Sequence, residues 1–186
     1  MSSKRIKTIP SERFDDCRGR LLRFVRAYGE RRITVEALRW LGGVSAAELD
    51  EPHTAVAAAF DGKRLVGLAC AARHGERAAF VVVHPAWRGA GIGPALLREL
   101  IGRLGRLTCV VACDNTPSMA MCFRAGMTAV QLTTGGSGRP ALRFVSADAQ
   151  GRPAFPAAAG LEERRDDRAT ESTIEAGENA LWHNRR

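Results

Sequence analysis

The chain has 186 residues, of which 45% are hydrophobic and 26% charged, and its formal net charge at pH 7 is +8. The length suggests one domain with room for a tail, and the composition is typical of a soluble globular protein rather than a disordered one. No uninterrupted apolar run approaches the ~20 residues that cross a bilayer, so we expect no membrane partner.

Alternating residues 5–9 predict a first strand that ends at Pro10. From residue 14 to 28, apolar residues recur at three- and four-residue steps, which predicts an amphipathic helix. Thr34 is suited to capping a second, shorter helix that ends at Gly42-Gly43. Two helices should therefore follow the first strand.

From residue 54, the spacing of the apolar residues becomes typical of β-strands. Residues 54–60 and 64–72 are apolar runs joined by Asp61-Gly62-Lys63, a strong hairpin signal, and residues 77–84 should form a third strand. The further elements predicted in chain order are a leucine-rich helix through residues 96–104, a strand at 107–113, a helix starting at Pro117 and ending at Gly126, and strands at 127–133 and 140–146. The order predicts an α/β domain with a mixed, mostly antiparallel central sheet of about seven strands and about four helices.

Beyond residue 146 this periodicity is lost. Residues 147–186 mix alanine, proline and charge without an amphipathic pattern. We therefore expect one folded domain over residues 1–146 and a mobile, disordered tail over 147–186.

The basic charge has two interpretations. Residues 1–145 hold 22 cationic and 12 acidic side chains, and 25 of the chain's 28 cations are arginine. An anionic partner such as nucleic acid would fit this excess, but so would a GC-rich genome that enriches arginine, alanine and glycine together. Because no interleaved aromatic residues offer a platform for bases, we favour the second interpretation and expect no nucleic-acid partner.

Cysteine and histidine usage points to a cytoplasmic protein without a metal. The five cysteines are odd in number and form no C-x-x-C pair, and the N-terminus leads into no apolar signal segment. The histidines are isolated in the sequence, which fits surface or turn positions better than metal ligands. They are His53, His74, His84 and His183.

The most informative stretch is the run from Val81 to Pro94, Val-Val-Val-His-Pro-Ala-Trp-Arg-Gly-Ala-Gly-Ile-Gly-Pro. A strand that passes through glycines into an apolar helix turns backbone N–H groups and the positive end of the helix toward one point. This arrangement predicts a phosphate cradle. Pro94 stands where a dinucleotide fingerprint needs its third glycine, and the chain lacks the Gly-Lys-Ser/Thr of a nucleoside-triphosphate loop.

Residues 83–93 of this stretch resemble the acyl-CoA loop of the GNAT N-acetyltransferase superfamily, whose signature is V-x-P-x-x-[RQ]-x-x-G-x-[GA]. The later run from Asp114 to Met119, continued to Gly126-Met127, resembles the second motif of that family. The resemblance covers residues 4–146 and implies the GNAT fold with acetyl-CoA as cosubstrate and no metal.

The resemblance also implies cofactor-binding roles. The backbone of the strand would pair with the pantetheine arm, the glycine turn would hold the pyrophosphate, and Arg88 and Asn115 match motif positions. The implied cofactor-binding residues are Val81, Val82, Val83, Arg88, Gly89, Ala90, Gly91, Ile92, Gly93 and Asn115. Pro94 departs from the pattern because it has no N–H to donate.

Transfer of acetyl to a primary amine requires a base, an oxyanion donor and a proton for the leaving thiolate. A strand N–H can stabilise the oxyanion. The nearest carboxylates are Glu76 and Asp114, each of which could equally be a solvated turn residue. Where many family members carry a tyrosine acid, this chain has Cys122, either a thiol proton donor or a packed helix residue.

The acceptor is expected between the first two helices and the loop Thr133–Arg139, and can be a small-molecule or a protein amine. Six arginines of the helical region would favour an anionic acceptor if they point inward and are otherwise solvated. They are Arg18, Arg20, Arg23, Arg26, Arg31 and Arg32. A homodimer is compatible with the pattern. The rival hypothesis is a non-catalytic acyl-CoA sensor, because both the tyrosine and a central-strand carboxylate are missing.

Overall fold

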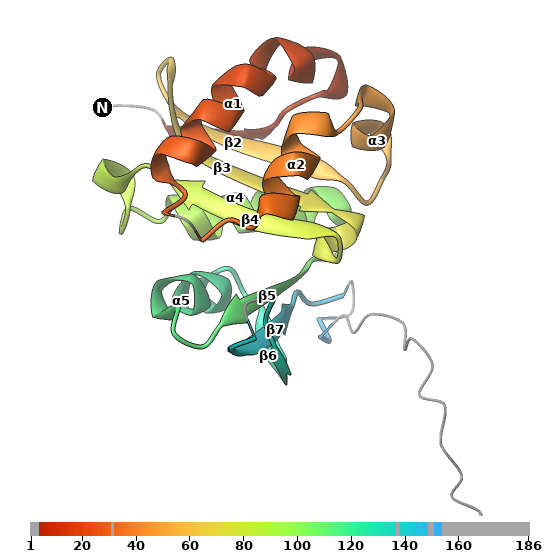
Figure 1. Ribbon diagram of the computed structural model, residues 1–186, viewed down its shortest axis with the longest axis vertical. Coiled ribbons are helices and arrows are strands. Elements are labelled where there is room, and N and C mark those ends of the chain that lie inside the picture. Colours follow the sequence, from red (N-terminus) through yellow and green to blue (C-terminus); the bar gives the residue numbers. More distant parts are fainter. Residues whose placement is uncertain (1–3, 31, 137, 149–150, 154–186) are drawn as a thin grey trace, which may run out of the picture. The chain divides into compact units, whose positions relative to one another are not determined.

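The computed structural model describes residues 4–30, 32–136, 138–148 and 151–153 (Figure 1). All of them lie in the first of two compact units, Met1–Pro156; the second unit, Ala157–Arg186, lies outside the described residues. Of the tail predicted from residue 147, the structure describes only an isolated bridge between Ala147 and Pro153 and the residues beside it. The tail therefore stays a prediction.

The elements follow the predicted order closely. In chain order they are β1 (Lys4–Thr8), η1 (Ser11–Arg13), α1 (Phe14–Tyr28), α2 (Val35–Gly43), α3 (Ala46–Asp50), β2 (Ala55–Asp61), β3 (Arg64–Ala72), η2 (Arg73–Gly75), β4 (Ala78–Val83), η3 (Pro85–Trp87), α4 (Ile92–Leu104), β5 (Thr108–Ala112), α5 (Thr116–Arg124), β6 (Thr128–Thr134) and β7 (Pro140–Val145). The short helix α3 was not predicted, because its single turn carries too few residues to show a period. None of the helices in the described part of the chain is long and apolar enough to span a membrane.

The first sheet is antiparallel in the order β1-β2-β3-β4 and is covered on both faces. Helices α1 and α2 lie in front of it and α4 behind it (Figure 1). Gly67 of β3 allows α4 to pack closely, because a Cβ there would lie 2.9 Å from side-chain carbons of both Ile92 and Leu96. This packing fixes α4, and with it the turn that leads into α4, against the sheet.

The second sheet is antiparallel in the order β5-β7-β6 and carries α5. The seven predicted strands are thus confirmed, but they form two sheets: across the described residues, no ladder of hydrogen bonds joins β4 to β5. The sheets approach each other at the start of both strands, where a Cβ on Gly75 would lie 1.9 Å from the Thr108 carbonyl oxygen. One edge of β4 is therefore left without a partner strand.

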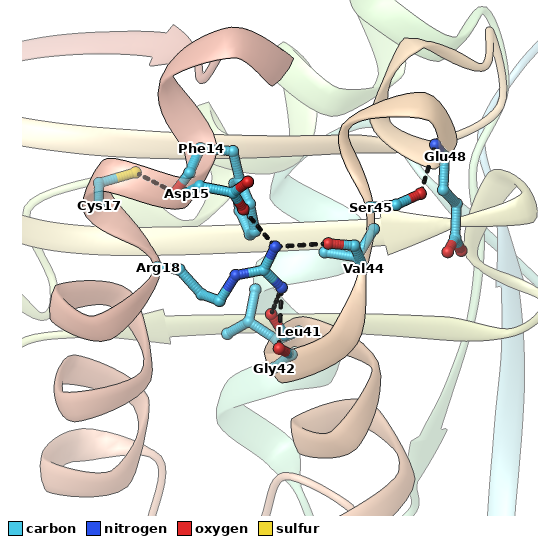
Figure 2. Close-up of polar contacts among 9 residues, drawn as sticks. All are labelled: Phe14, Asp15, Cys17, Arg18, Leu41, Gly42, Val44, Ser45 and Glu48. Carbon is cyan, nitrogen blue, oxygen red and sulfur yellow. Dashed lines mark hydrogen bonds and ion pairs between the residues drawn. The ribbon is translucent and has the colours of Figure 1, made fainter.

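Arg18 joins α1 to the end of α2 (Figure 2). Its guanidinium donates to the carbonyl oxygens of Gly42 at 2.8 Å and Val44 at 2.7 Å, with a longer contact to Leu41 at 3.5 Å, and it pairs with Asp15. Because the last carbonyls of a helix have no partner within the helix, this arginine satisfies groups that would otherwise need water. The sequence predicted that Arg18 is either solvated or directed toward a substrate. The structure shows instead that it caps the end of α2.

Replacing Arg18 by methionine should lower the free energy of unfolding by about 1–3 kcal/mol, because several hydrogen bonds to a charged donor are lost while the apolar stem is kept. Urea unfolding of both proteins measures the difference. Arg26→Met is the matched control, since Arg26 is exposed on the same helix. Equal losses in the two variants would contradict a capping role for Arg18.

Candidate functional site

The turn between β4 and α4 is open toward solvent. Gly89 and Gly91 have φ angles of 76° and 78°, which L side chains rarely adopt, and both residues are exposed. Apart from each glycine's own chain neighbours, no heavy atom of the described structure lies within 4 Å of the place where a Cβ would stand on either glycine. No other part of the described chain therefore fills the turn, and a bulky group can approach its backbone.

The N-terminus of α4 faces this turn without a side-chain cap. Gly91 occupies the N-cap position, and Ala95 donates its N–H to the Gly91 carbonyl at 3.2 Å. The N–H groups of Ile92 and Gly93 precede that first helical bond and have no acceptor in the helix, whereas Pro94 has no N–H. Two amides and the positive helix end are thus available to an anion.

Gly93 favours close packing as well. A Cβ at this position would lie 2.6 Å from Sδ of Met121 in α5. A side chain here would force Met121 to move, so the glycine lets α5 pack closely against the start of α4. The glycine run therefore serves two purposes, an open turn at residues 89–91 and a close helix contact at residue 93.

The unpartnered edge of β4 exposes alternate backbone groups. His84 donates its N–H to the Val66 carbonyl at 2.9 Å, and in an antiparallel ladder the direction of these groups alternates from residue to residue. Val82 therefore points its backbone groups to β3, while Val81 and Val83 point theirs to the open edge. Of the three predicted valines, Val81 and Val83 therefore face this edge, although the Val83 carbonyl already accepts a hydrogen bond from Nε of Arg88 at 3.2 Å.

Arg88 is bound by the protein itself. Its Nε donates to the Val83 carbonyl at 3.2 Å, its Nη2 lies 3.5 Å from the Tyr28 carbonyl, and its guanidinium pairs with Glu30. The side chain thus ties the turn to the connection between α1 and α2. This places Arg88 beside the turn, where it holds the turn in position and its charge is paired with Glu30.

Asn115 follows β5 and caps α5. Its Oδ1 accepts a hydrogen bond from the Ser118 N–H at 3.4 Å. The same oxygen cannot donate, and the Nδ2 group has no partner among the residues described. Asn115 is half-buried and keeps a donor available.

Cys122 is buried in α5, with its Sγ 3.8 Å from Sγ of Cys109 in β5. The hydrogen bond with Cys109 lowers the pKa of Cys122 below the ordinary thiol value, although burial acts in the opposite direction. The same hydrogen bond and burial raise the pKa of Cys109 well above that value. Of the pair, Cys122 is the stronger acid.

The two carboxylates predicted from sequence lie at opposite ends of the strands. Glu76 is exposed just before β4, which spans about 17 Å from Ala78 to Val83 at 3.3 Å per residue. Asp114 follows β5 and pairs with Arg139 at 2.8 Å. Asp114 is thus paired with a residue of the β6–β7 loop. Of these two carboxylates, Glu76 is the one that forms no ion pair in the described structure.

Sequence reasoning missed a pocket of about 280 Å³ on the α1 face of the first sheet. Its lining residues are Arg20, Arg23, Phe24, Ala27, Tyr28, Arg64, Leu65 and His84. Only the fold brings α1 beside the start of β3 and the end of β4, so no local motif signals this pocket. Among the other helical arginines, Arg26 and Arg32 are exposed, and Arg31 lies outside the described residues.

The histidines do not form a metal centre in the described part of the chain, which holds no group of three or more metal-ligating side chains. His53 and His74 nevertheless lie together, with their ring centroids 5.8 Å apart. Burial and the Arg106 charge lower the pKa of His74. His183 is outside the described residues.

Comparison with known proteins agrees with this geometry. The family model described as acetyltransferase (GNAT) family matches residues 20–127. Among solved structures, a GNAT-family acetyltransferase from Streptococcus pneumoniae is 15% identical, with a TM-score of 0.58 and coverage of 77% of this chain and 98% of that one. A search of curated proteins finds no match.

Two further solved structures share the fold. The aminoglycoside acetyltransferase AAC(6')-Ib, in complex with ribostamycin and coenzyme A, is 13% identical, with a TM-score of 0.55 and coverage of 89% of this chain and 99% of that one. A Vibrio cholerae spermidine N-acetyltransferase chimera is 15% identical, with a TM-score of 0.55 and coverage of 78% and 95%. Since the family model spans more than half of the chain, this protein belongs to the GNAT acetyltransferase family and is an N-acetyltransferase.

Proposed function

We propose that the protein transfers an acetyl group from acetyl-CoA directly to a primary amine. The observation that carries this proposal is the combination of an open glycine turn, two helix amides without acceptors and an unpartnered edge of β4. The fold relative AAC(6')-Ib, solved in complex with acetyl-CoA, supports the choice of cosubstrate. A cytoplasmic location and a homodimer stay predictions.

The binding roles follow from the placement of each group. The amides of Ile92 and Gly93, with the turn at Gly89, Ala90 and Gly91, would hold the diphosphate. The backbone of Val81 and Val83 would pair with the pantetheine arm as an added strand would. Asn115 would donate Nδ2 to the same ligand, and Arg88 would keep the turn in position.

Two side chains, Cys122 and Glu76, are candidates for the proton transfers that the reaction needs. Cys122 would give its proton to the departing thiolate, and its lowered pKa makes it a better-matched donor than an ordinary thiol. Glu76 would take the proton of the amine through intervening water, because it precedes β4 and lies at the opposite end of that strand from the glycine turn. An N–H on the β4 edge would stabilise the oxyanion.

The acceptor class remains a small-molecule or protein amine. Fold relatives include an aminoglycoside and a spermidine N-acetyltransferase, so amines of these kinds are reasonable first substrates for an assay. Release of free thiol from acetyl-CoA in the presence of an amine measures turnover. Saturable coenzyme A binding without thiol release across a broad amine panel would favour the sensor hypothesis instead.

Gly91→Trp should weaken coenzyme A binding, because an indole would occupy the space beside the turn. We expect calorimetry to show a Kd at least tenfold higher than that of the wild type. The matched control is Gly105→Trp at the other end of α4, where φ is 75° and no described atom lies near the added Cβ. Both variants carry the same left-handed strain. Equal weakening in both would show that strain, and not the turn, controls binding.

Cys122→Ala should lower kcat by about 10²–10⁴ if the thiol is the proton donor. A donor must be protonated, so kcat of the wild type should fall as pH rises through the pKa of Cys122, at a lower pH than for an ordinary thiol. The variant should lack this limb of the pH profile. Cys70→Ala, which removes a thiol fully buried in β3, is the control. An unchanged kcat and pH profile in Cys122→Ala would leave Cys122 a packing residue.

Glu76→Gln should lower kcat at neutral pH by at least tenfold and leave coenzyme A binding unchanged, because an amide cannot accept the amine proton. Raising the pH should partly restore the rate as more amine is already neutral. Glu12→Gln, on the exposed turn before α1, is the control for charge. A rate equal to that of the control would assign the deprotonation to water.

A further inference from the structure

We propose that the pocket between α1, the start of β3 and the end of β4 is a binding site for a phosphate or carboxylate group. The site is distinct from the glycine turn, and the proposal does not depend on the proposed function. Arg20 and Arg23 from α1 and Arg64 from β3 supply its charge, and His84 stands at its border with the turn.

The three arginines bring a concentrated positive charge. None of them has a carboxylate partner among the described residues. Arg20 is held over the β2–β3 hairpin by donating to the Lys63 carbonyl at 2.8 Å. Asp61 lies opposite Arg64 in the β2–β3 register, yet the two make no ion pair. An anion entering this pocket would meet three guanidinium groups that form no ion pair in the described structure, with the Asp61 carboxyl on the neighbouring strand as the nearby opposing charge.

One wall of the pocket is built of aromatic rings in contact. Tyr28 packs edge-on against Phe24, with ring centroids 5.1 Å apart, and its ring is tilted against that of His84 at a centroid distance of 4.5 Å. Because these rings come from α1 and from the residue that follows β4, they hold the end of α1 against the end of β4, beside the arginines of α1 and β3. Together with the arginines they line an open pocket of about 280 Å³, in which Arg20, Arg23 and Arg64 are all exposed to solvent.

The ring of His84 faces more hydrogen-bond donors than it can accept from. Its Nδ1 lies 3.2 Å from the Ala86 N–H, and its Nε2 lies 3.0 Å from Nη2 of Arg64. A neutral imidazole has only one acceptor nitrogen, so both contacts cannot be hydrogen bonds. When Nδ1 accepts from Ala86, Nε2–H and the guanidinium are two donors facing each other. An anionic oxygen that accepts from both would satisfy this pair.

The chemistry favours phosphate or carboxylate over other ligands. Guanidinium groups bind the planar or tetrahedral oxygens of these anions in a bidentate manner, and a polyamine would be repelled by the same groups. Such a group could belong to the acceptor molecule, to the coenzyme's own ribose phosphate or to a free anion. The pocket borders the turn through His84, and the competition experiment below distinguishes these sources.

The test uses inorganic phosphate as the probe, titrated at constant ionic strength and followed by ³¹P NMR line broadening. Wild-type protein should bind saturably, and Arg64→Gln and Arg23→Gln should each raise the Kd at least tenfold. Arg26→Gln removes the same charge from the exposed part of α1 and should leave the Kd within twofold. Equal weakening by Arg26→Gln, or no saturation in the wild type, would overturn the proposal.

A second measurement separates this pocket from the glycine turn. Phosphate binding should persist in Gly91→Trp; if it disappears there and survives in Arg64→Gln, the anion binds only at the turn and the pocket proposal is wrong. Saturating coenzyme A then identifies the source of the anion. Competition between coenzyme A and phosphate assigns the pocket to the coenzyme's phosphate, while undisturbed phosphate binding assigns it to an acceptor or a free anion.

Discussion

An interior strand edge without a partner is the constraint on which the site depends. Backbone N–H and C=O groups are nearly always paired when buried, and a strand edge is normally paired, covered or exposed to water. Here β3 takes one edge of β4, while the other edge faces a second sheet that makes no ladder with it. The close contact of Gly75 with Thr108 holds the strands together at one end, so the free edge of Val81 and Val83 lies beyond it. A ligand with amide groups can complete that edge as a strand would.

The glycine turn leaves backbone groups uncovered at the start of α4, as the edge of β4 does along the strand. Gly67 lets α4 pack against β3, Gly93 lets α5 pack against α4, and the left-handed angles at Gly89 and Gly91 keep the backbone between them bare. Packing therefore fixes the helix end, and the absence of side chains keeps it accessible. Arg88 completes the arrangement by joining the Val83 carbonyl to Glu30, so the position of the turn also depends on the connection between α1 and α2.

Local patterns predicted the elements well because each was encoded by neighbouring residues. The Asp61-Gly62 hairpin, the Thr34 cap, which accepts from the Ala37 N–H at 3.1 Å, and the glycine turn all formed where expected. Features that depend on distant residues were missed. The division into two sheets depends on which strands meet across the fold, and the capping role of Arg18 requires α2 to end beside α1. The pairing of Cys109 with Cys122, thirteen residues apart, likewise needs α5 to fold back over β5.

Charge distribution links the two regions that the fold places side by side. The turn offers neutral amides and a helix dipole, whereas the pocket beside it offers full positive charges held by α1 and β3. Amides recognise a diphosphate by shape at close range, while guanidinium groups attract anions over a Debye length of about 8 Å at physiological salt. His84 belongs to both regions, since its Nδ1 contacts the Ala86 N–H near the turn and its Nε2 contacts Arg64 in the pocket. If the pocket is occupied as proposed, a ligand group that moved the His84 ring would also disturb its contact with the Ala86 N–H, at the start of the segment that leads into the proposed acyl-CoA cradle.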